Sequence, residues 1–326
     1  MEISSPSVEI VTPLASVITN VQFDHQNWLG NTRAEIAAEK AGIIKHGVPV
    51  VTATDAPEAL EVIRETARKF SAPLTIVAVP ETAPRAGGEH TIGQPAFPVP
   101  LLRGISSGLP DNFSLPLLGE HQRLNAALAI ATVEGLQHQI PVSAGAIRTG
   151  LESVHWPGRL QLVNTASGQT ILLDGAHNPA SAVALREALD SEHVRALIFT
   201  RRQGTARIPS PEAATGTLIL GTLADKDWPR MCAILAPLAG RVLLTPVGSE
   251  RTAAPEELRA ACAQANPNAD TMACPSLADA LQHAANDAFV IITGSLYLVG
   301  EAMELLGISP ATLASERGLN EWMLKK

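Results

Sequence analysis

Short hydrophobic runs alternate with amphipathic segments along most of the chain. Apolar positions that recur every three or four residues indicate helices, and short β-branched runs indicate strands. In the first half, this pattern predicts strands at residues 15–23, 48–53 and 74–79, and helices at residues 33–41, 56–70, 120–136 and 141–154. The stretch 83–116 is rich in Gly, Pro and Ser and predicts loops with irregular strands.

The second half repeats the alternation after a break at Trp156-Pro157-Gly158. It predicts strands at residues 160–163, 170–173, 196–200, 217–220, 241–245 and 289–293, and helices at residues 228–235, 255–264, 277–286 and 296–306. A further helix follows Pro179, with Asn178 as its N-cap. The chain therefore reads as a parallel α/β protein with two domains, residues 1–157 and 158–326.

Composition narrows the class of protein. At 326 residues, with 46% hydrophobic and 17% charged residues, the chain is expected to fold around a sizeable core. A net charge of -8 argues against a nucleic-acid partner. No apolar run reaches the roughly 18 residues that a membrane helix needs, and no leader pattern is present at the start. The three cysteines fit neither a zinc site nor a disulfide framework, so we expect a cytoplasmic protein.

Several polar residues follow directly after predicted strands, where open α/β sheets bind their ligands. His25 follows the first strand, and an imidazole can ligate Mg²⁺, although oxygen ligands are commoner for that ion. Asp174 and His177 lie between a strand and the helix that begins at Pro179, whose N-terminal N–H groups suit an anion. The alternatives are a strand-end histidine bonded to nearby backbone, and a helix cap beside a solvent-exposed histidine.

Isolated cations form a second group of candidates. The sequence has only six lysines, among them Lys40 and Lys226. Arg159 follows the interdomain break, and both Arg159 and Lys226 could pair with a phosphate. The alternatives are a helix-end cation for Lys40, an interdomain ion pair for Arg159 and a charged loop for Lys226. Gly294-Ser295 after the last strand is equally explained as turn chemistry before a helix.

No single stretch identifies a protein family, but the sequences of these stretches and their order along the chain do. The chain reads FDHQNWLG, EKAGI, LPLLGEHQRLNAALA, WPGRL, DGAHNP, LADKD and GSLYLVGE in sequence. Over residues 10–306 this series resembles the folylpolyglutamate synthase/dihydrofolate synthase family of the Mur ligase superfamily. The resemblance implies a central ATPase domain and a C-terminal Rossmann-like domain. It also implies ATP-dependent addition of L-glutamate to dihydropteroate or tetrahydrofolate through an acyl phosphate, with Mg²⁺.

The resemblance also implies roles for individual residues in the first domain. His25 matches a Mg²⁺-ligating histidine of the family. Lys40 matches a catalytic lysine that is carbamylated, which converts a cation into a group able to help hold a metal. Asn125 matches an asparagine that contacts adenine.

In the second domain, the matching positions surround the nucleotide. Arg159 corresponds to a contact near the phosphates of ATP, and Asp174 to one near the ribose. His177 and Lys226 lie in motifs that carry catalytic residues. A Mur-type cell-wall ligase is a more distant alternative, because the motifs EKAGI and DGAHNP resemble those of the folate enzymes of the superfamily.

The chain departs from the family in its first residues. The family places a phosphate-binding loop upstream of residue 10, but here Met1–Glu9 read MEISSPSVE and no Gly-Lys dipeptide occurs anywhere. A G-x-x-x-x-G-K-[ST] loop is therefore absent from this sequence. We expect a central ATPase domain without its N-terminal third, and no ligase activity from the isolated chain. The alternative is a non-catalytic or split-gene fragment that acts with a separately encoded N-terminal partner.

Overall fold

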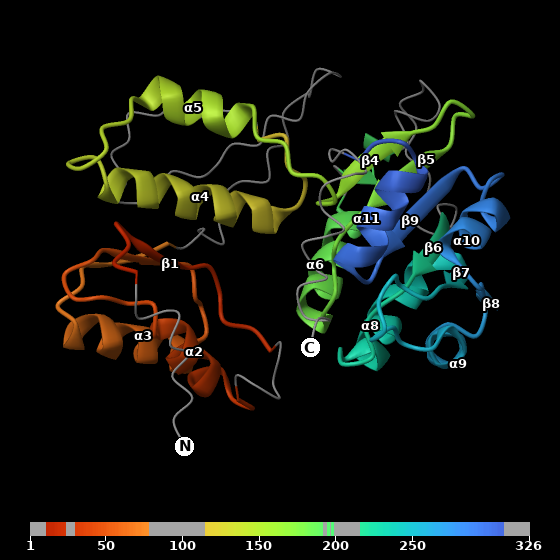
Figure 1. The fold of residues 1–326 in the computed structure, drawn as a ribbon, viewed down its shortest axis with the longest axis horizontal. Helices are drawn as coiled ribbons and strands as arrows, with labels where there is room; N and C mark the ends of the chain where they lie inside the picture. The colour runs from red at the N-terminus through yellow and green to blue at the C-terminus, as the bar shows by residue number, and fades with distance from the viewer. Residues whose placement is uncertain are drawn as a thin grey trace, which may run out of the picture. The chain divides into compact units, whose positions relative to one another are not determined.

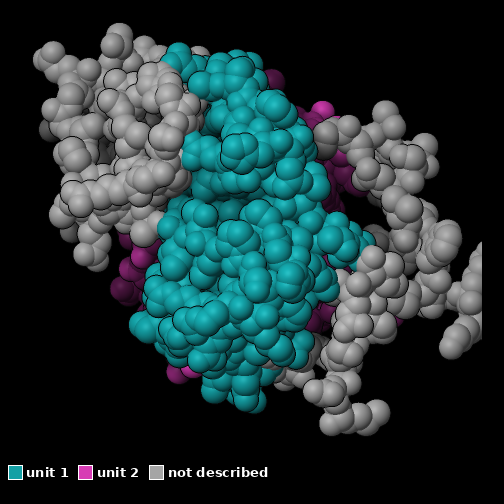
Figure 2. All heavy atoms as spheres, turned by 90° about the vertical axis from the view of Figure 1, so that its left-hand side faces the viewer, with its two compact units in different colours: residues 1–156 teal, residues 157–326 magenta. Residues whose placement is uncertain are grey.

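The computed structural model describes residues 11–23, 30–77, 115–191, 194–195, 197–198 and 216–309. The chain divides into two compact units, residues 1–156 and 157–326, shown in different colours in Figure 2. Each unit holds its own β-sheet with helices packed on it (Figure 1). The α/β class expected from the alternating pattern is confirmed. Among the helices that the structure describes, none combines the length and apolar character needed to cross a bilayer.

Unit 1 is a three-layered arrangement around a short parallel sheet of order β1-β2-β3. Its elements are β1 (Ser16–Ile18), α2 (Arg33–Ala41), β2 (Val50–Thr52), α3 (Pro57–Lys69), β3 (Leu74–Ile76), α4 (Glu120–Gly135) and α5 (Ala144–Glu152). Helices α2 and α3 cover one face of the sheet, and α4 lies on the other (Figure 1).

The alternation of side chains in β2 explains these layers. Val50 packs with Ile36 of α2 and Ile63 of α3 in one core cluster. Its neighbour Val51 points to the opposite face and packs with Leu128 of α4 in a second cluster. Because successive side chains of a strand point to opposite faces, a strand that is apolar at both positions needs helices on both sides.

Unit 2 contains a six-stranded sheet of order β4-β5-β9-β6-β7-β8. Its strands are β4 (Gln161–Asn164), β5 (Thr170–Leu173), β6 (Gly216–Leu220), β7 (Ala239–Leu244), β8 (Asp270–Ala273) and β9 (Phe289–Thr293). Its helices are α6 (Pro179–Asp190), α8 (Trp228–Leu235), the 3-10 turn η2 (Ala236–Leu238), α9 (Pro255–Ala265), α10 (Leu277–His283) and α11 (Leu296–Leu305). All strand pairs are parallel except β4–β5.

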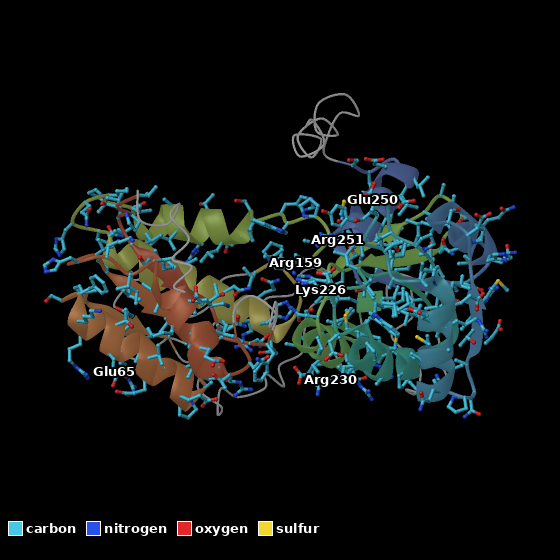
Figure 3. The ribbon with its side chains drawn as sticks, turned by 60° about the horizontal axis from the view of Figure 1, so that its bottom comes forward. Glu65, Arg159, Lys226, Arg230, Glu250 and Arg251 are labelled. Atoms are coloured by element: carbon cyan, nitrogen blue, oxygen red, sulfur yellow. The ribbon has the colours of Figure 1, made fainter. Side chains whose placement is uncertain are left out.

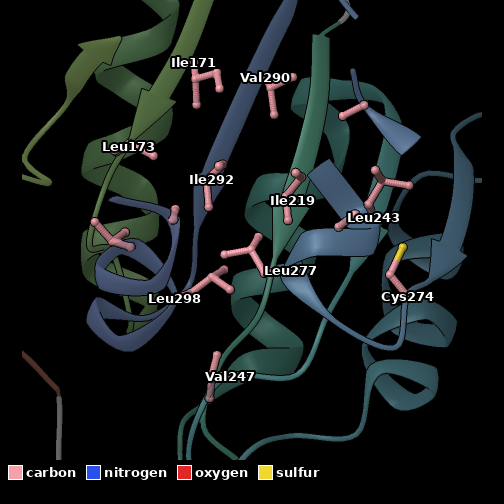
Figure 4. Packing of buried hydrophobic residues seen from close by; sticks show 14 of the residues in the cluster. Ile171, Leu173, Ile219, Leu243, Val247, Cys274, Leu277, Val290, Ile292 and Leu298 are labelled. Carbon is pink, nitrogen blue, oxygen red and sulfur yellow. The ribbon is translucent and has the colours of Figure 1, made fainter. Parts of the chain in front are cut away.

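The core of unit 2 forms where the central strands meet α10 and α11. Ile292 of β9 and Ile219 of β6 lie in one cluster with Leu277 of α10 and Leu298 of α11, all fully buried (Figure 4). Burying each such side chain contributes about 1.5–3 kcal/mol. The central strands are apolar at consecutive positions, as expected of strands buried on both faces.

Three expectations about unit 2 need correction. Strand β4 is antiparallel to β5, because Thr165–Gln169 form a tight connection closed by the Thr165 N–H donating to the Gln169 carbonyl at 2.9 Å. Strand β8 was not expected, since its sequence DTMA is too short and polar to stand out. The strand predicted at residues 196–200 is wrong, because Leu197 and Ile198 are helical. Alanine and leucine in that stretch favour a helix as readily as a strand.

We expect Gly294→Ala to destabilise unit 2 more than Gly307→Ala. Both glycines have a positive φ, +110° and +68°, but a Cβ at Gly294 would lie 2.5 Å from the carbonyl oxygen of Gly221, whereas Gly307 faces open space. The conformational strain at Gly307 costs about 1 kcal/mol, and the added backbone clash at Gly294 raises the cost to about 2–4 kcal/mol. Thermal or urea unfolding of the two variants measures the difference, and equal losses would contradict the close approach.

Candidate functional site

The loops that follow β5, β6 and β9 come together at the carboxyl edge of the six-stranded sheet. The Asp174 N–H donates to the carbonyl of Ile292 at 3.1 Å, and the Gly221 N–H donates to the carbonyl of Thr293 at 3.3 Å. A Cβ at Gly294 would lie 2.5 Å from the Gly221 carbonyl oxygen, and a Cβ at Gly221 would lie 2.6 Å from the Thr245 carbonyl oxygen. This edge is where open α/β sheets bind their ligands.

The buried carboxylate of Asp174 fastens the start of unit 2 to this edge. Its Oδ2 accepts the Leu160 N–H at 3.0 Å, and its Oδ1 accepts the Ala176 N–H at 2.9 Å. The Gly175 N–H donates to the Gly158 carbonyl at 2.9 Å, which ties the two loops a second time. Leu160 has a left-handed backbone, with φ of 45°, a conformation that such a residue adopts only under constraint.

Burial raises the pKa of Asp174 above its ordinary range, despite opposing influences. The N–H groups of Leu160 and Ala176 and the charges of Arg159 and His177 all favour the ionised carboxylate. Loss of water around the carboxylate outweighs them because the side chain is almost completely enclosed. Asp174 therefore has a structural role at this edge, where its carboxylate joins the turn at Leu160 to the loop at Ala176, while its contact with a ligand stays a prediction.

Arg159 and His177 lie on the two loops that Asp174 joins. Arg159 sits between Gly158 and Leu160, and the backbone bond from Gly175 to Gly158 brings it beside residues 174–177. The ring Nδ1 of His177 lies 2.8 Å from the Gly175 carbonyl. A carbonyl can only accept, so Nδ1 carries the hydrogen and Nε2 is the basic nitrogen of the neutral ring.

The N-terminus of α6 confirms the expected cap and adds one residue. Asn178 Oδ1 accepts the Ser181 N–H at 2.8 Å, and Pro179 occupies the first helical position. Ser181 Oγ in return accepts the N–H groups of His177 at 3.0 Å and Asn178 at 3.1 Å. The sequence analysis did not single out Ser181, although a polar residue three positions after an N-cap is the signal of a capping box.

Lys226 lies on the loop after β6, at the same edge. The neighbouring Asp225 pairs with Arg251 at 3.6 Å, and the Ala224 N–H donates to the Arg251 carbonyl at 2.7 Å. Arg159 lies just before β4, Lys226 on the loop after β6 and Arg251 on the loop after β7 (Figure 3). Three cationic side chains therefore lie at this edge, which suits an anionic ligand.

Buried hydroxyl groups line the ends of β6 and β9. Thr222 Oγ1 and Thr293 Oγ1 are enclosed and make no hydrogen bond within the described part of the chain. Ser295 caps α11, because its Oγ accepts the Tyr297 N–H at 3.1 Å, so the turn chemistry expected at Gly294-Ser295 is confirmed. The two threonines carried no recognisable signal in the sequence, because their burial depends on the packing of distant strands.

Lys40 and Asn125 belong to unit 1. Lys40 lies in the last turn of α2, and its Nζ donates to the Asn20 carbonyl at 2.9 Å. Asn125 is exposed on α4, and its Nδ2 donates to Gln122 Oε1 at 3.1 Å. His25 lies outside the described residues. Within those residues no cluster of three or more His, Cys, Asp and Glu side chains could hold a metal ion.

Comparisons with known proteins point to one group of enzymes. No model of a protein family matches the chain. The chain is 32% identical over 307 residues to the dihydrofolate synthase/folylpolyglutamate synthase of Bacillus subtilis, covering 92% of this chain and 64% of that protein. It is 32% identical over 309 residues to the folylpolyglutamate synthase of Lacticaseibacillus casei, again covering 64% of the relative.

Solved structures of the same group of synthases also align with this chain. Mycobacterium tuberculosis folylpolyglutamate synthase complexed with ADP and AMPPCP aligns with a TM-score of 0.69 and 28% identity, over 90% of this chain and 64% of that one. E. coli FolC in complex with DHPP and ADP aligns with a TM-score of 0.66 and 26% identity, over 90% and 62%. The chain is therefore homologous to these synthases and spans a little under two thirds of their length.

We expect Asp174→Asn to weaken folding of unit 2 and to change its pH dependence. An amide offers one acceptor where two backbone N–H groups need one each, which costs about 1–3 kcal/mol. Because the folded pKa of Asp174 is raised, its contribution to stability is full below the ordinary carboxyl pKa and is lost as pH rises through the folded pKa.

Urea unfolding at a series of pH values measures both effects. The difference between the native protein and Asp174→Asn should shrink as pH rises across that window. The control is Asp190→Asn, which removes an exposed carboxylate that pairs with Arg186 at 3.7 Å. A difference that is independent of pH would show that Asp174 titrates normally.

Proposed function

We propose that this chain is part of an ATP-dependent ligase that joins L-glutamate to a folate, such as dihydropteroate or tetrahydrofolate. The observation that carries the proposal is the carboxyl edge of unit 2, where Arg159, His177 and Lys226 surround a backbone fastened by Asp174. Homology to folylpolyglutamate and dihydrofolate synthases along 92% of the chain supports the substrate class. The ADP and AMPPCP complexes of a homologue support the nucleotide.

The proposed reaction has two steps. A carboxylate oxygen of the folate attacks the γ-phosphorus of ATP, and ADP leaves with the electrons of the broken P–O bond. The amine of glutamate then attacks the carbonyl carbon of the acyl phosphate, and phosphate leaves. Charge neutralisation dominates such a transfer, so we assign Arg159 and Lys226 to the negative charge on the phosphates.

The ring of His177 suits the second step. The glutamate amine must lose a proton before or as it forms the amide, and a basic nitrogen near neutrality serves this purpose. The bond from Nδ1 to the Gly175 carbonyl leaves Nε2 as the nitrogen that accepts a proton. Assignment of His177 as the proton acceptor is our proposal on this ground.

Two further nucleotide contacts are proposed from the matching motifs. Asp174 is assigned to the ribose, and Asn125 to the adenine. An ionised carboxylate has about four acceptor positions, and the two backbone N–H groups occupy only two of those on Asp174. A ribose hydroxyl would have to donate to it at the 7% of the residue that stays exposed. Asn125 is exposed on α4, which leaves its side chain accessible to a base.

Mg²⁺ is proposed with His25 as a ligand, and Lys40 is proposed to be carbamylated. The described residues contain no cluster that fits a metal ion, so we derive no step through it. The Lys40 contact is compatible with either state, because a carbamate nitrogen keeps one hydrogen that can donate to the Asn20 carbonyl. Carbamylation joins the neutral amine to CO₂ and releases one proton.

The roles of the two units and the cellular compartment of the protein are also proposals. We assign residues 1–157 to the remainder of a central ATP-binding domain and residues 158–326 to the glutamate-ligase domain. The three cysteines are all free thiols and buried, which supports a reducing compartment such as the cytoplasm.

We expect the purified chain to bind ATP–Mg weakly, and Arg159→Ala to weaken that binding by about tenfold or more, as loss of a charge-assisted contact to phosphate predicts. Calorimetric titration measures the affinity. Arg259→Ala serves as the matched control, because Arg259 is a partly exposed side chain of α9 that pairs with Glu256 at 2.7 Å and is not among the candidate residues. Equal affinity for the native protein and Arg159→Ala would remove Arg159 from the nucleotide site.

We expect Lys40 to take up CO₂ when the protein is incubated with isotopically labelled bicarbonate. Carbon NMR should show one carbamate signal, because the amine lies beside a carbonyl that holds it in place. Lys40→Arg should abolish the signal, and Lys45→Arg should retain it. A signal that survives in Lys40→Arg would show that another amine is carbamylated.

A further inference from the structure

The loop after β7 is held against the loop after β6 at the carboxyl edge of the unit 2 sheet. The Ala224 N–H donates to the Arg251 carbonyl at 2.7 Å, and the Ala253 N–H donates to the Thr222 carbonyl at 2.9 Å. The residues between these two bonds form an isolated antiparallel bridge. The loops therefore pair as two very short strands do, and the backbone of Arg251 is fixed beside the loop that carries Lys226.

The turn that carries Arg251 is also closed within its own loop. Ser249 Oγ accepts the Arg251 N–H at 3.3 Å, and the Ser249 carbonyl accepts the Thr252 N–H at 3.1 Å. Thr252 Oγ1 accepts the N–H of Val247 at 2.9 Å, and Val247 is buried in the core of unit 2. A side chain on so firmly held a backbone loses less conformational freedom when it binds a ligand.

The guanidinium group of Arg251 carries only a loose ion pair. Its Nη1 lies 3.6 Å from Asp225 Oδ2, which is longer than a hydrogen bond, and the side chain is 61% exposed. This contact shows that a carboxylate can approach the group at this edge. The planar guanidinium matches the two oxygens of a carboxylate with two parallel N–H groups, which an ammonium cannot do.

The proposed reaction brings two carboxylates that need partners. The amine of the incoming glutamate attacks, so both of its carboxylates stay ionised, while Arg159 and Lys226 are assigned to the phosphates. The strand order β5-β9-β6-β7 places the loop of His177 and the loop of Arg251 at separate positions along the edge. The α-carboxylate shares its carbon with the amine, so the side-chain carboxylate is the group that can extend from His177 towards Arg251.

We propose that Arg251 binds the side-chain carboxylate of the incoming glutamate and so selects glutamate over its neutral amide, glutamine. This rests on the proposed function, which supplies glutamate as the substrate. The amide of glutamine offers one acceptor and turns an N–H group towards a guanidinium that only donates. A site built to pair with one group discriminates strongly against an analogue that lacks it.

The test measures binding of L-glutamate and L-glutamine to the 326-residue chain by NMR titration, without ATP or folate. We expect the native chain to prefer glutamate by about tenfold, and Arg251→Ala to lose that preference. Arg251→Lys should keep part of it, because the charge remains without the planar fork. Arg230→Ala is the matched control and should change nothing, because Arg230 forms a similar pair with Asp227 at 3.5 Å.

A purely structural role of Arg251 would weaken both amino acids alike, so an equal loss of both would overturn the proposal. A preference for glutamate that survives in Arg251→Ala, or a native chain that does not bind glutamate, would overturn it as well. Titration of the same proteins with ATP–Mg separates this result from the proposed function. Absence of ATP–Mg binding by the native chain would count against the ligase and leave the glutamate preference standing.

Discussion

The buried carboxylate of Asp174 is the interaction on which the candidate site depends. It receives one N–H from the turn at Leu160 and one from the loop at Ala176, and so joins segments separated by the whole β4–β5 hairpin. Arg159 owes its position to the first bond and His177 to the second. These bonds and the nearby Arg159 reduce the cost of removing the carboxylate from water without cancelling it, so the pKa of Asp174 stays raised.

The same edge is packed so closely that a Cβ at Gly221 or Gly294 would meet backbone. Gly221 and Gly294 bring the ends of β6 and β9 together, and Gly175 lies so close to Leu296 that a Cβ would meet its side chain. Close packing at these glycines fixes the positions of the turns that carry the candidate residues.

Much of the fold follows from local signals. The helix bounds at residues 33–41 and 228–235 were correct because Thr32 and Asp227 cap those helices and the apolar spacing is regular. Strand direction was not accessible, because an antiparallel β4 has the same periodicity as a parallel one. The motifs drew attention to Arg159, Asp174 and Lys226 as candidate residues. The buried threonines could not be predicted, because their burial depends on contacts between segments that are distant in the sequence.

The bond between His177 Nδ1 and the Gly175 carbonyl has a further consequence. A relay passes a proton into one ring nitrogen and out through the other, which requires the two nitrogens to exchange roles. The carbonyl cannot donate a hydrogen, so Nδ1 cannot become an acceptor while this contact lasts. In the proposed reaction, a proton that reaches Nε2 would therefore leave from the same nitrogen, and His177 would accept and return protons without passing them through its ring.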